Sequence, residues 1–339
     1  MVSGVARLVC VRCTKARAVS PIRESIAGSR HMMYGGVAAD TSRQTNGPIW
    51  GGRALRLVSF ELHGNVCGGV EVGNGMASFA SLGLPSSMRE FLALGADGVS
   101  RAQQALVRPG VEVHNFSAVK PLAPVPDPRK VICVGLNYKD HARESGAPIP
   151  PEPALFSKFP TAVIASGEPI VLPPVSQEVD YEAELVIVIG RGGRHITKES
   201  ATRHIAGYTC GHDVSARDWQ LKKPGGQWMA GKTFDTFAPV GPALVTSDTI
   251  ADPMNLPIKM RLNGQTMQDS NTRELIFDPH FLVAYISQVI TLEPGDLIFT
   301  GTPPGVGFAR KPPVFLKAGD VCEVEIGGIG VLRNPVVKG

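Results

Sequence analysis

The sequence predicts a strand-rich α+β fold. Its 339 residues include 38 glycines and 28 prolines, which is typical of a chain with many turns. Short apolar segments follow one another between Gly, Asn and Asp turn signals, without the strand–helix alternation of a doubly wound sheet. Hydrophobic residues make up 43% of the chain, which is enough for a sizeable core.

The first 53 residues differ in composition from the rest of the chain. They contain 8 of the 34 Lys and Arg residues but only 2 of the 30 Asp and Glu residues. Such Arg-rich, acid-poor segments are typical of mitochondrial transit peptides, although a disordered tail without a targeting role has the same composition. We expect residues 1–53 to be a transit peptide and disordered leader, which predicts a mitochondrial protein of the matrix.

Charge and hydropathy exclude two classes of partner. Without the leader, acidic residues slightly outnumber basic ones, so the chain lacks the basic surface of a nucleic-acid-binding protein. No apolar run reaches the roughly 20 residues that span a bilayer. We therefore expect neither nucleic acid nor a membrane as a partner.

A small N-terminal α/β domain is predicted at 54–122. It begins with a hairpin of two strands, at 54–62 and 65–72. The proline-rich segment 119–130 is the best linker candidate, because proline is excluded from central strands and stiffens a connection. The larger domain is expected at 123–339.

Two helices follow the hairpin in this small domain. Ser87 and Glu90 have capping-box spacing at the start of the first, which Gly95 can end. The second helix lies in SRAQQALV and stops before Pro109.

The larger domain is predicted to consist mostly of strands. KVICVGLNY predicts a buried strand, and Asn263-Gly264 predicts the turn of a hairpin. One amphipathic helix is predicted from Asp278, whose side chain can cap it, with Pro279 in its first turn. Gly-Asp turns precede two further strands, in EPGDLIFTG and KAGDVCEVEI.

The segment VDYEAELVIVIG carries the pattern that most needs an explanation. Its second half is an uninterrupted apolar run, which predicts a strand buried on both faces. Because alternate side chains of a strand share a face, Asp180, Glu182 and Glu184 are expected on the same side as Val186 and Val188. Adjacent carboxylates at a low-dielectric core repel each other, so they require a cation or protonation.

A second strand serves as an internal comparison. Glu323 and Glu325 have the same spacing, but their strand is apolar on the other face alone, which is typical of a solvated acidic face. For Glu182 and Glu184 two explanations remain open from the residues themselves: ion pairs with Lys or Arg, or a bound metal ion.

Further charged residues could take part in either a metal site or an ion-pair network with Glu182 and Glu184. An apolar strand ends at Asp213, which could join a metal site or cap the helix that carries Arg217. Lys232 and Lys158 both lie among apolar residues, and a buried lysine requires an anionic partner. The carboxylates and lysines could therefore form an ion-pair network without a metal.

Two other motifs allow both a functional and an ordinary interpretation. His141 and Glu144 have helical i, i+3 spacing, which suits either a proton-transferring pair or a solvated ion pair. The glycine-rich segment FTGTPPGVG could bind an anion through its backbone N–H groups. On its own, we interpret that segment as a plain surface turn.

Five motifs in this order and at these separations point to a known family: VICVGLNYKDHARE, VDYEAELVIVIG, HDVSARDWQ, GKTFDTFAPVGP and TGTPPGVG. Together they resemble the fumarylacetoacetate hydrolase superfamily, from about residue 55 to the C-terminus. The resemblance implies a mixed β-roll that forms a homodimer. It also implies that Glu182, Glu184 and Asp213 bind Mg²⁺, with Mn²⁺ or Ca²⁺ as alternatives.

The same resemblance implies roles for other residues. His141 and Glu144 match a proton-transfer pair on a lid, and Lys232 is a further catalytic candidate. Residues that match positions around the substrate carboxylate and 2-oxo group are Lys158, Arg217, Gln220 and Thr302, with Lys232. Acylpyruvate-cleaving relatives often have Arg where this chain has Leu136.

Substrates of the family share a 1,2-dicarbonyl end, and the metal stabilises an enolate of a small 2-oxo acid. The family includes mitochondrial oxaloacetate tautomerases, and the leader suits that location. We expect oxaloacetate enol–keto tautomerisation, which needs only the metal, the enolate and one proton shuttle. Alternatives are a C–C hydrolase (acylpyruvase) or decarboxylase acting on acylpyruvate-type or oxaloacetate-type acids and, more distantly, a non-enzymatic binding protein.

Overall fold

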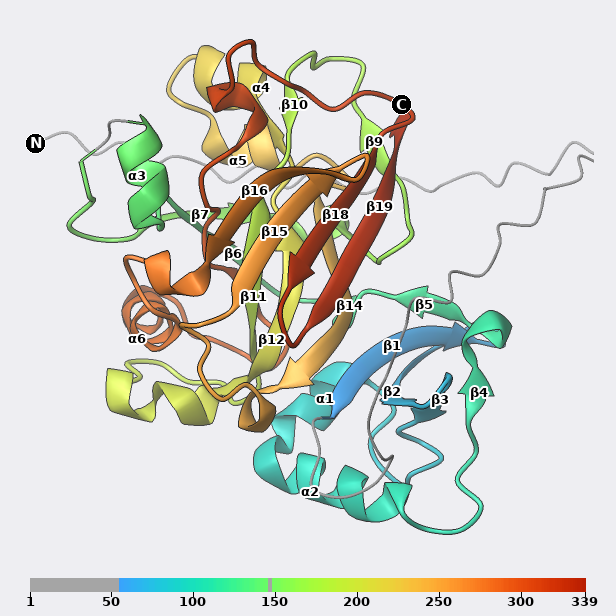
Figure 1. Cartoon of the computed structure of the whole chain (residues 1–339). Coiled ribbons are helices and arrows are strands. Elements are labelled where there is room, and N and C mark those ends of the chain that lie inside the picture. Colours follow the sequence, from blue (N-terminus) through green and yellow to red (C-terminus); the bar gives the residue numbers. More distant parts are fainter. Residues whose placement is uncertain (1–54, 146–147) are drawn as a thin grey trace, which may run out of the picture. The chain divides into compact units, whose positions relative to one another are not determined.

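A computed structural model describes residues 55–145 and 148–339 (Figure 1). The predicted leader at 1–53 lies outside these described residues. Within them, no helix combines the length and the apolar character needed to cross a membrane.

A large sheet of twelve strands carries most of the fold. Its strand order is β4-β3-β2-β1-β14-β12-β11-β17-β6-β7, with β5 on β1 and β8 on β14 (Figure 1). Its pairs are antiparallel except β17–β6 and β14–β8, so the sheet is mixed. The strands are β1 (Arg56–Leu62), β2 (Asn65–Val72), β3 (Gly75–Ser78), β4 (His114–Asn115), β5 (Lys120–Leu122), β6 (Val131–Gly135), β7 (Ala154–Lys158), β8 (Val163–Ile164), β11 (Ala183–Ile189), β12 (Ile205–His212), β14 (Ala238–Thr246) and β17 (Leu297–Phe299).

A second sheet has five strands in the order β16-β15-β18-β19-β9, and β10 pairs separately with β13. Both larger sheets are open and neither closes into a barrel. This strand-rich, mixed arrangement confirms the predicted fold class. The strands are β9 (Ile170–Leu172), β10 (Val179–Asp180), β13 (Ser215–Ala216), β15 (Pro257–Leu262), β16 (Gln265–Asn271), β18 (Val321–Ile326) and β19 (Gly330–Lys338).

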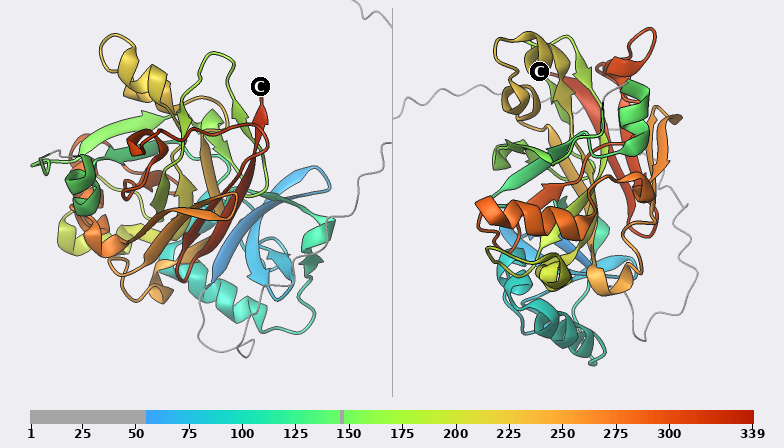
Figure 2. Two further views of the ribbon diagram at one scale, coloured as in Figure 1. Left: turned by 45° about the horizontal axis from the view of Figure 1, so that its top comes forward. Right: turned by 90° about the vertical axis from the view of Figure 1, so that its left-hand side faces the viewer.

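The helices are few and short. Figures 1 and 2 place α4 and α5 at the opposite end of the described structure from α1 and α2. The α-helices are α1 (Met88–Ala93), α2 (Gly95–Leu106), α3 (Lys139–Ser145), α4 (Arg217–Lys222), α5 (Trp228–Lys232) and α6 (Pro279–Val289). The 3₁₀ helices are η1 (Phe116–Ala118), η2 (Pro160–Ala162), η3 (Lys198–His204), η4 (Ser247–Thr249), η5 (Thr272–Glu274) and η6 (Gly307–Ala309).

Strand β11 lies between two hydrophobic cores. Leu185 and Ile187 belong to the core that includes the second sheet and α6. Val186 and Val188 belong to the core that includes α1 and α2. All seven residues of β11 are buried, so the predicted strand with two buried faces is confirmed.

Local signals in the sequence produce the expected turns and caps. Asn263 and Gly264 have φ angles of 53° and 80°, as a two-residue hairpin turn between β15 and β16 requires. The Ser87 side chain accepts from the Glu90 N–H at 3.2 Å at the start of α1. Asp278 accepts from the Phe281 N–H at 2.9 Å at the start of α6.

The strand expected across VDYEAELVIVIG is interrupted, which corrects our prediction. β10 ends at Asp180 and β11 begins at Ala183, so Tyr181 and Glu182 lie outside the regular ladder. The Asp180 carboxylate accepts from the Tyr181 N–H at 2.8 Å. A local side-chain acceptor of this kind competes with ladder hydrogen bonds.

The N-terminal strands continue the large sheet. β1 pairs with β14 through Arg56 and Leu57, and β5, which lies within the proline-rich segment, pairs with β1. The β1–β2 hairpin is confirmed. The sheet therefore contains strands from both sides of the proposed boundary at 122, and that boundary remains a prediction.

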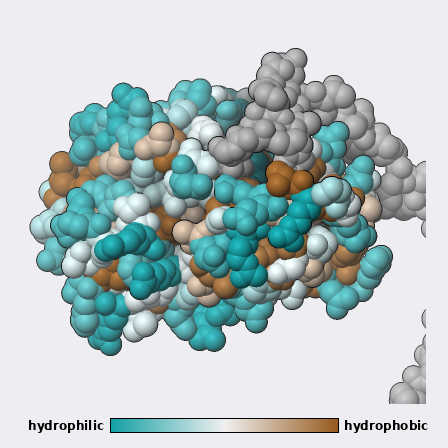
Figure 3. Space-filling view, turned by 90° about the horizontal axis from the view of Figure 1, so that it is seen from below, coloured by the Kyte–Doolittle hydropathy of each residue, from teal (hydrophilic) through white to brown (hydrophobic). Residues whose placement is uncertain are grey.

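The described surface mixes polar and apolar side chains. On the face seen in Figure 3, hydrophobic residues form separate patches among hydrophilic ones. Exposed large apolar residues of the described chain include Val66, Val107 and Val289. Scattered exposure of this kind is usual for globular proteins.

We predict that Asp278→Asn destabilises the protein at neutral pH but not in acid. Partial burial opposes ionisation, but Lys198 and the Phe281 N–H outweigh it and lower the pKa of Asp278. A carboxyl whose pKa is lowered on folding stabilises the native state above its unfolded pKa of about 4 and loses that effect as pH falls through the folded value. Urea unfolding should show a loss of about 1 kcal/mol at pH 7, which disappears in acid.

The matched control is Asp252→Asn, in a turn where, among the described residues, the Asp252 carboxylate accepts only from the Met254 N–H. Its loss at pH 7 should be smaller than that of Asp278→Asn, because the Asp252 carboxylate forms no ion pair with the described residues. An Asp278→Asn loss that stays constant from pH 7 to pH 3 would contradict the electrostatic explanation.

Candidate active site

A cavity of about 480 Å³ opens at the end of the large sheet where β11 begins and β6, β12 and β17 end. Every predicted site residue except Lys158 lines it. Its wall is formed by the ends of these strands, by α3, α4 and α5, and by the segment that follows β17.

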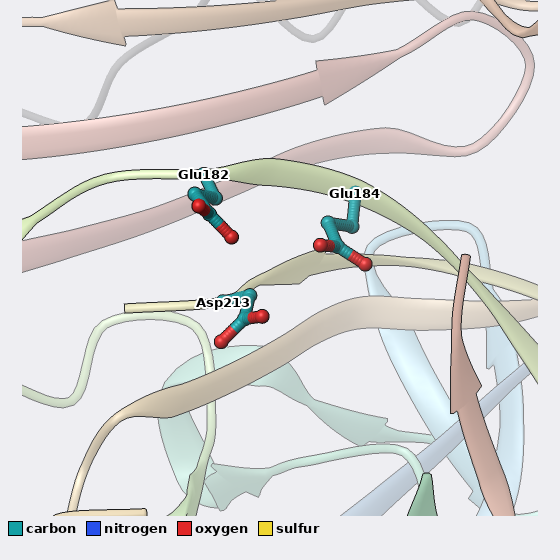
Figure 4. Close-up of side chains that lie close together, drawn as sticks. All are labelled: Glu182, Glu184 and Asp213. Atoms are coloured by element: carbon teal, nitrogen blue, oxygen red, sulfur yellow. The ribbon is translucent and has the colours of Figure 1, made fainter. Parts of the chain in front are cut away.

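Three buried carboxylates gather at the floor of the cavity. Glu182, Glu184 and Asp213 each contribute an oxygen atom, and these three atoms lie within 4.8 Å of one another. Figure 4 shows Glu182 and Glu184 extending from the start of β11 toward the segment that carries Asp213. The Asp213 N–H donates to the Glu182 carbonyl at 2.9 Å, which joins the two segments where the regular ladder stops.

Lys232 forms hydrogen-bonded ion pairs with two of these carboxylates. Its Nζ lies 2.7 Å from Glu182 Oε2, 2.8 Å from Asp213 Oδ2 and 2.8 Å from the Ser215 hydroxyl. Burial opposes its charge, but Asp213 and Glu182 outweigh that effect and raise the pKa of Lys232. The Phe156 ring lies over the ammonium, 5.0 Å from its centroid.

Arg217 connects Glu182 to another buried acid. Its Nη2 donates to Glu182 Oε1 at 2.6 Å, its Nε to Asp180 Oδ2 at 2.8 Å, and its Nη1 to Gln220 Oε1 at 2.9 Å. Burial would raise the pKa of Glu182, but Lys232 and Arg217 hold it well below its usual range.

Lys158 lies behind Asp213, outside the cavity lining, which differs from the substrate contact that we expected. Its Nζ donates to the carbonyl oxygens of Val214 at 3.0 Å, Phe237 at 2.8 Å and Lys232. These three bonds use all three N–H groups. Asp213 Oδ1 therefore lies 2.6 Å from the ammonium but accepts no hydrogen bond from the described residues.

Glu184 differs from its neighbours because no ion pair joins it to any described residue. It accepts from the Gly301 N–H at 2.7 Å and is 1% exposed. Burial, together with Asp213 and Glu182, raises the pKa of Glu184 well above its usual range. The ion-pair network that the sequence allowed is therefore present, but it does not include Glu184.

The donor set suits a hard divalent cation. Glu184 lacks a cationic partner, and Asp213 Oδ1 is a buried oxygen that accepts no hydrogen bond within the described structure. Carboxylate oxygens are the ligands that Mg²⁺, Mn²⁺ and Ca²⁺ prefer. An ion near Glu182, Glu184 and Asp213 would satisfy both groups.

His141 and Glu144 lie on one face of α3, as their spacing predicts, and both line the cavity. The Nδ1 atom of His141 lies 3.2 Å from Glu144 Oε2. Glu144 also accepts from the Gly305 N–H at 3.2 Å. Because Glu144 binds Nδ1, the tautomer that it favours carries its hydrogen there and leaves Nε2 as the proton acceptor.

The segment after β17 binds carboxylates through its backbone. N–H groups of Gly301 and Gly305 donate to Glu184 and Glu144. Gly301, Thr302 and Pro303 are buried, so the interpretation as a surface turn was wrong. The anions that this segment holds are side chains of the protein itself.

Gln220 and Thr302 are buried in the cavity wall. The Thr302 hydroxyl donates to the Ala183 carbonyl at 2.9 Å and accepts from Gln268 Nε2 at 2.8 Å. Its orientation is therefore fixed. The capping role considered for Asp213 is wrong, because the residue at the N-cap of α4 is Ala216.

Asp180 is the main residue whose role the sequence did not indicate, although its place beside Glu182 was noted. It is fully buried and accepts from Arg217 and from the N–H groups of Gly307 at 2.7 Å and Phe308 at 3.0 Å. A Cβ atom on Gly307 would lie 1.8 Å from the Val314 carbonyl oxygen, so no side chain fits there.

Apolar side chains form the upper wall. Trp228 packs edge-on against Phe156, with ring centroids 5.5 Å apart. A Cβ atom on Gly135 would lie 2.5 Å from the Trp228 ring, so glycine lets the indole contact the end of β6. Leu136, also in the lining, has a φ angle of 52°.

Comparison with known proteins places these residues in a family context. The model of the fumarylacetoacetate (FAA) hydrolase C-terminal family matches residues 130–337. The chain is 50% identical over 298 residues to a Bos taurus protein named oxaloacetate tautomerase FAHD2A, mitochondrial. That match covers 86% of this chain and 94% of the bovine protein.

Solved structures show the same fold. A putative HpcE protein from Mycobacterium smegmatis has a TM-score of 0.74 and 37% identity, covering 84% of this chain and 99% of its own. Maleylpyruvate hydrolase from Sphingobium sp. SYK-6, in complex with manganese(II) ion and pyruvate, has a TM-score of 0.70 and 32% identity. It covers 84% of this chain and 99% of its own.

We predict that Asp180→Asn lowers the free energy of unfolding by about 3 kcal/mol, because removing one member of a buried ion pair leaves the other uncompensated. The amide also places an N–H₂ group against N–H donors of Gly307 and Phe308. Urea unfolding followed by circular dichroism measures the loss.

Asp218→Asn is the control, since Asp218 accepts from Ser176, Gln177 and Trp219 but pairs with no cation in the described structure. It should lose about 1 kcal/mol, the scale of one neutral hydrogen bond. Equal losses in both variants would show that the charge of Asp180 is unimportant.

Proposed function

The chain belongs to the fumarylacetoacetate hydrolase family, and on that premise we propose that it is a divalent-metal-dependent oxaloacetate enol–keto tautomerase. The observation that carries the proposal is the buried carboxylate cluster, in which Glu184 has no cationic partner among the described residues, in one cavity with His141 and Glu144. The name of the bovine relative supports oxaloacetate as the substrate.

In this proposal Glu182, Glu184 and Asp213 hold the metal ion, and Mg²⁺ is the first choice. The manganese(II) ion in the maleylpyruvate hydrolase complex supports a divalent ion in this fold. When bound, such an ion acts as a Lewis acid that polarises the 2-oxo group of the substrate.

The side chains around the cluster would bind and orient the acid. Arg217 and Lys232 present cationic groups to the first carboxylate and the 2-oxo oxygen, and Gln220 and Thr302 offer polar contacts beside them. Lys158 would act from behind by holding Asp213 in place.

Tautomerisation moves one proton between the C2 oxygen and C3, with no net change in charge or bonding to water. We assign this transfer to His141 Nε2, with Glu144 binding Nδ1–H and orienting the ring. Leu136, Phe156 and Trp228 would exclude bulk water from the reacting carbons.

Two features of the whole protein belong to the same proposal. We propose a mitochondrial location, supported by the composition of residues 1–53 and by the name of the bovine relative. We also propose a homodimer, which rests on the family resemblance and is measurable by sedimentation of the purified protein.

A direct assay tests the proposed activity. Purified protein with Mg²⁺ should accelerate the loss of enol-oxaloacetate absorbance, and EDTA should abolish the acceleration. The alternative is C–C hydrolysis, which the maleylpyruvate hydrolase neighbour favours. Release of a carboxylic acid from an acylpyruvate, without acceleration of oxaloacetate tautomerisation, would establish the hydrolase and refute the tautomerase.

We predict that Glu184→Gln abolishes metal binding without destabilising the metal-free protein, because Glu184 forms no ion pair with the described residues. Glu182→Gln should also abolish binding but cost about 3 kcal/mol, since it separates Lys232 and Arg217 from a buried partner. Thermal unfolding with and without Mg²⁺ measures both effects, because a ligand of the native state raises its stability by mass action.

Glu323→Gln, on the solvent-facing side of β18, is the control and should keep the full response to Mg²⁺. The metal assignment fails if Glu184→Gln keeps the same Mg²⁺-dependent rise in unfolding temperature as the wild type.

We predict that His141→Ala lowers turnover of enol-oxaloacetate roughly 10²- to 10⁴-fold, the usual contribution of a general acid–base. Glu144→Gln should cost less, because Glu144 orients the ring and does not carry the transferred proton. The Mg²⁺-dependent rise in unfolding temperature should persist in both variants, since neither residue belongs to the carboxylate cluster.

His63→Asn is a suitable control, as His63 is exposed with a φ angle of 50° that asparagine tolerates. It should have wild-type kinetics. Full turnover in His141→Ala would remove the ring from the mechanism and make Lys232 the next candidate.

A further inference from the structure

Three cationic side chains line the cavity, namely Arg217, Lys232 and Lys311. Arg217 and Lys232 each contact two buried carboxylates. Lys311 makes no ion pair or hydrogen bond with any side chain in the described ranges 55–145 and 148–339, and it is a solvent-exposed residue of the cavity lining. Its charge is therefore available to a ligand.

The backbone that carries Lys311 is held firmly. The neighbouring Arg310 donates to the Tyr181 hydroxyl at 3.0 Å and to the Met267 carbonyl at 2.6 Å. Just upstream, Gly307 and Phe308 donate to Asp180. The segment that carries Lys311 is therefore held in place, partly by Asp180, the acid that also binds Arg217.

The buried charges around the carboxylate cluster can balance one carboxylate of a substrate but not a second one. The floor has one more buried carboxylate than buried cations, so a divalent ion would give it a net charge of about +1, which the first carboxylate of a substrate balances. Leu136, Phe156 and Trp228 line the same cavity and offer no charge to a second carboxylate on the substrate. Of the three cationic side chains in the lining, Arg217 and Lys232 are already paired with buried carboxylates, and Lys311 is not.

We propose that Lys311 binds the second carboxylate of the substrate and thereby selects dicarboxylic 2-oxo acids over monocarboxylic ones. The inference rests on the proposed function, because it names the substrate class of the same cavity. Lys311 acts here as a specificity-determining residue and takes no part in the proton transfer.

Steady-state kinetics on two enol substrates tests the proposal: enol-oxaloacetate, with two carboxylates, and enol-phenylpyruvate, with one. Lys311→Met should raise KM for oxaloacetate roughly tenfold, the scale of one charge-assisted hydrogen bond, with kcat changed less than about twofold. Kinetics on phenylpyruvate should stay at wild-type values, and Lys311→Arg should retain most of the affinity for oxaloacetate.

Lys317→Met is the matched control, because Lys317 is an exposed lysine in the same connection that does not line the cavity. It should leave both substrates unaffected. Equal changes in KM for the two substrates, or no change for oxaloacetate, would overturn the proposal.

A binding measurement separates this inference from the tautomerase assignment. Calorimetric titration of the Mg²⁺-loaded protein compares 2-oxoglutarate with 2-oxovalerate, which have the same chain length but differ in the terminal carboxylate. Tighter binding of 2-oxoglutarate that Lys311→Met removes would support the role of Lys311 even if oxaloacetate is not turned over. Equal affinity of the wild type for the two acids, including no measurable binding of either, would overturn it.

Discussion

Burial of like charges at one end of β11 is the constraint on which the site depends. Four carboxylates are buried there: Asp180, Glu182, Glu184 and Asp213. Three buried cations face them: Lys158, Arg217 and Lys232. Unpaired charge in a low-dielectric interior is strongly unfavourable, so each cation must serve more than one group. Lys158 also satisfies three carbonyl groups, which spreads its charge over the turn that carries Asp213. The carboxylate left without a cationic partner among the described residues is Glu184, and a metal ion would neutralise it.

The segment after β17 also stabilises these buried carboxylates, through the dipoles of its backbone N–H groups. Within a few residues its N–H groups bind Glu184 on the floor, Glu144 on α3 and Asp180 below Arg217. The carboxylate cluster, the His141–Glu144 pair and the Asp180–Arg217 ion pair are therefore attached to one short piece of chain. Glycine is required where this piece lies closest to its neighbours, as at Gly307. A shift of this segment would change all three parts together, so the site behaves as one unit.

The sequence predicted those features that depend on nearby residues. The Asn263-Gly264 turn and the Asp278 cap follow from local backbone chemistry, and the burial of both faces of β11 follows from its apolar run. The sequence could not predict contacts set by distant segments. The position of Lys158 depends on carbonyl groups 56 to 79 residues away along the chain. The Asp180 carboxylate is held by N–H groups of Gly307 and Phe308, which are 127 and 128 residues away. The family resemblance brought together residues that periodicity alone left separate.

The apolar upper wall bears on which reaction the cavity suits. C–C hydrolysis must admit a water molecule, activate it and stabilise a carbon leaving group, whereas tautomerisation returns the same proton to another atom of the substrate. Leu136 supplies no cation beside α3, and Trp228 and Phe156 present hydrocarbon to the space above the carboxylates. Such a wall excludes water and strengthens electrostatic contacts at the floor. It therefore disfavours the reaction that consumes water relative to the one that only moves a proton. The carboxylate cluster and the His141–Glu144 pair would serve either reaction. On this reasoning the apolar side chains of the cavity wall determine whether tautomerisation or hydrolysis is favoured.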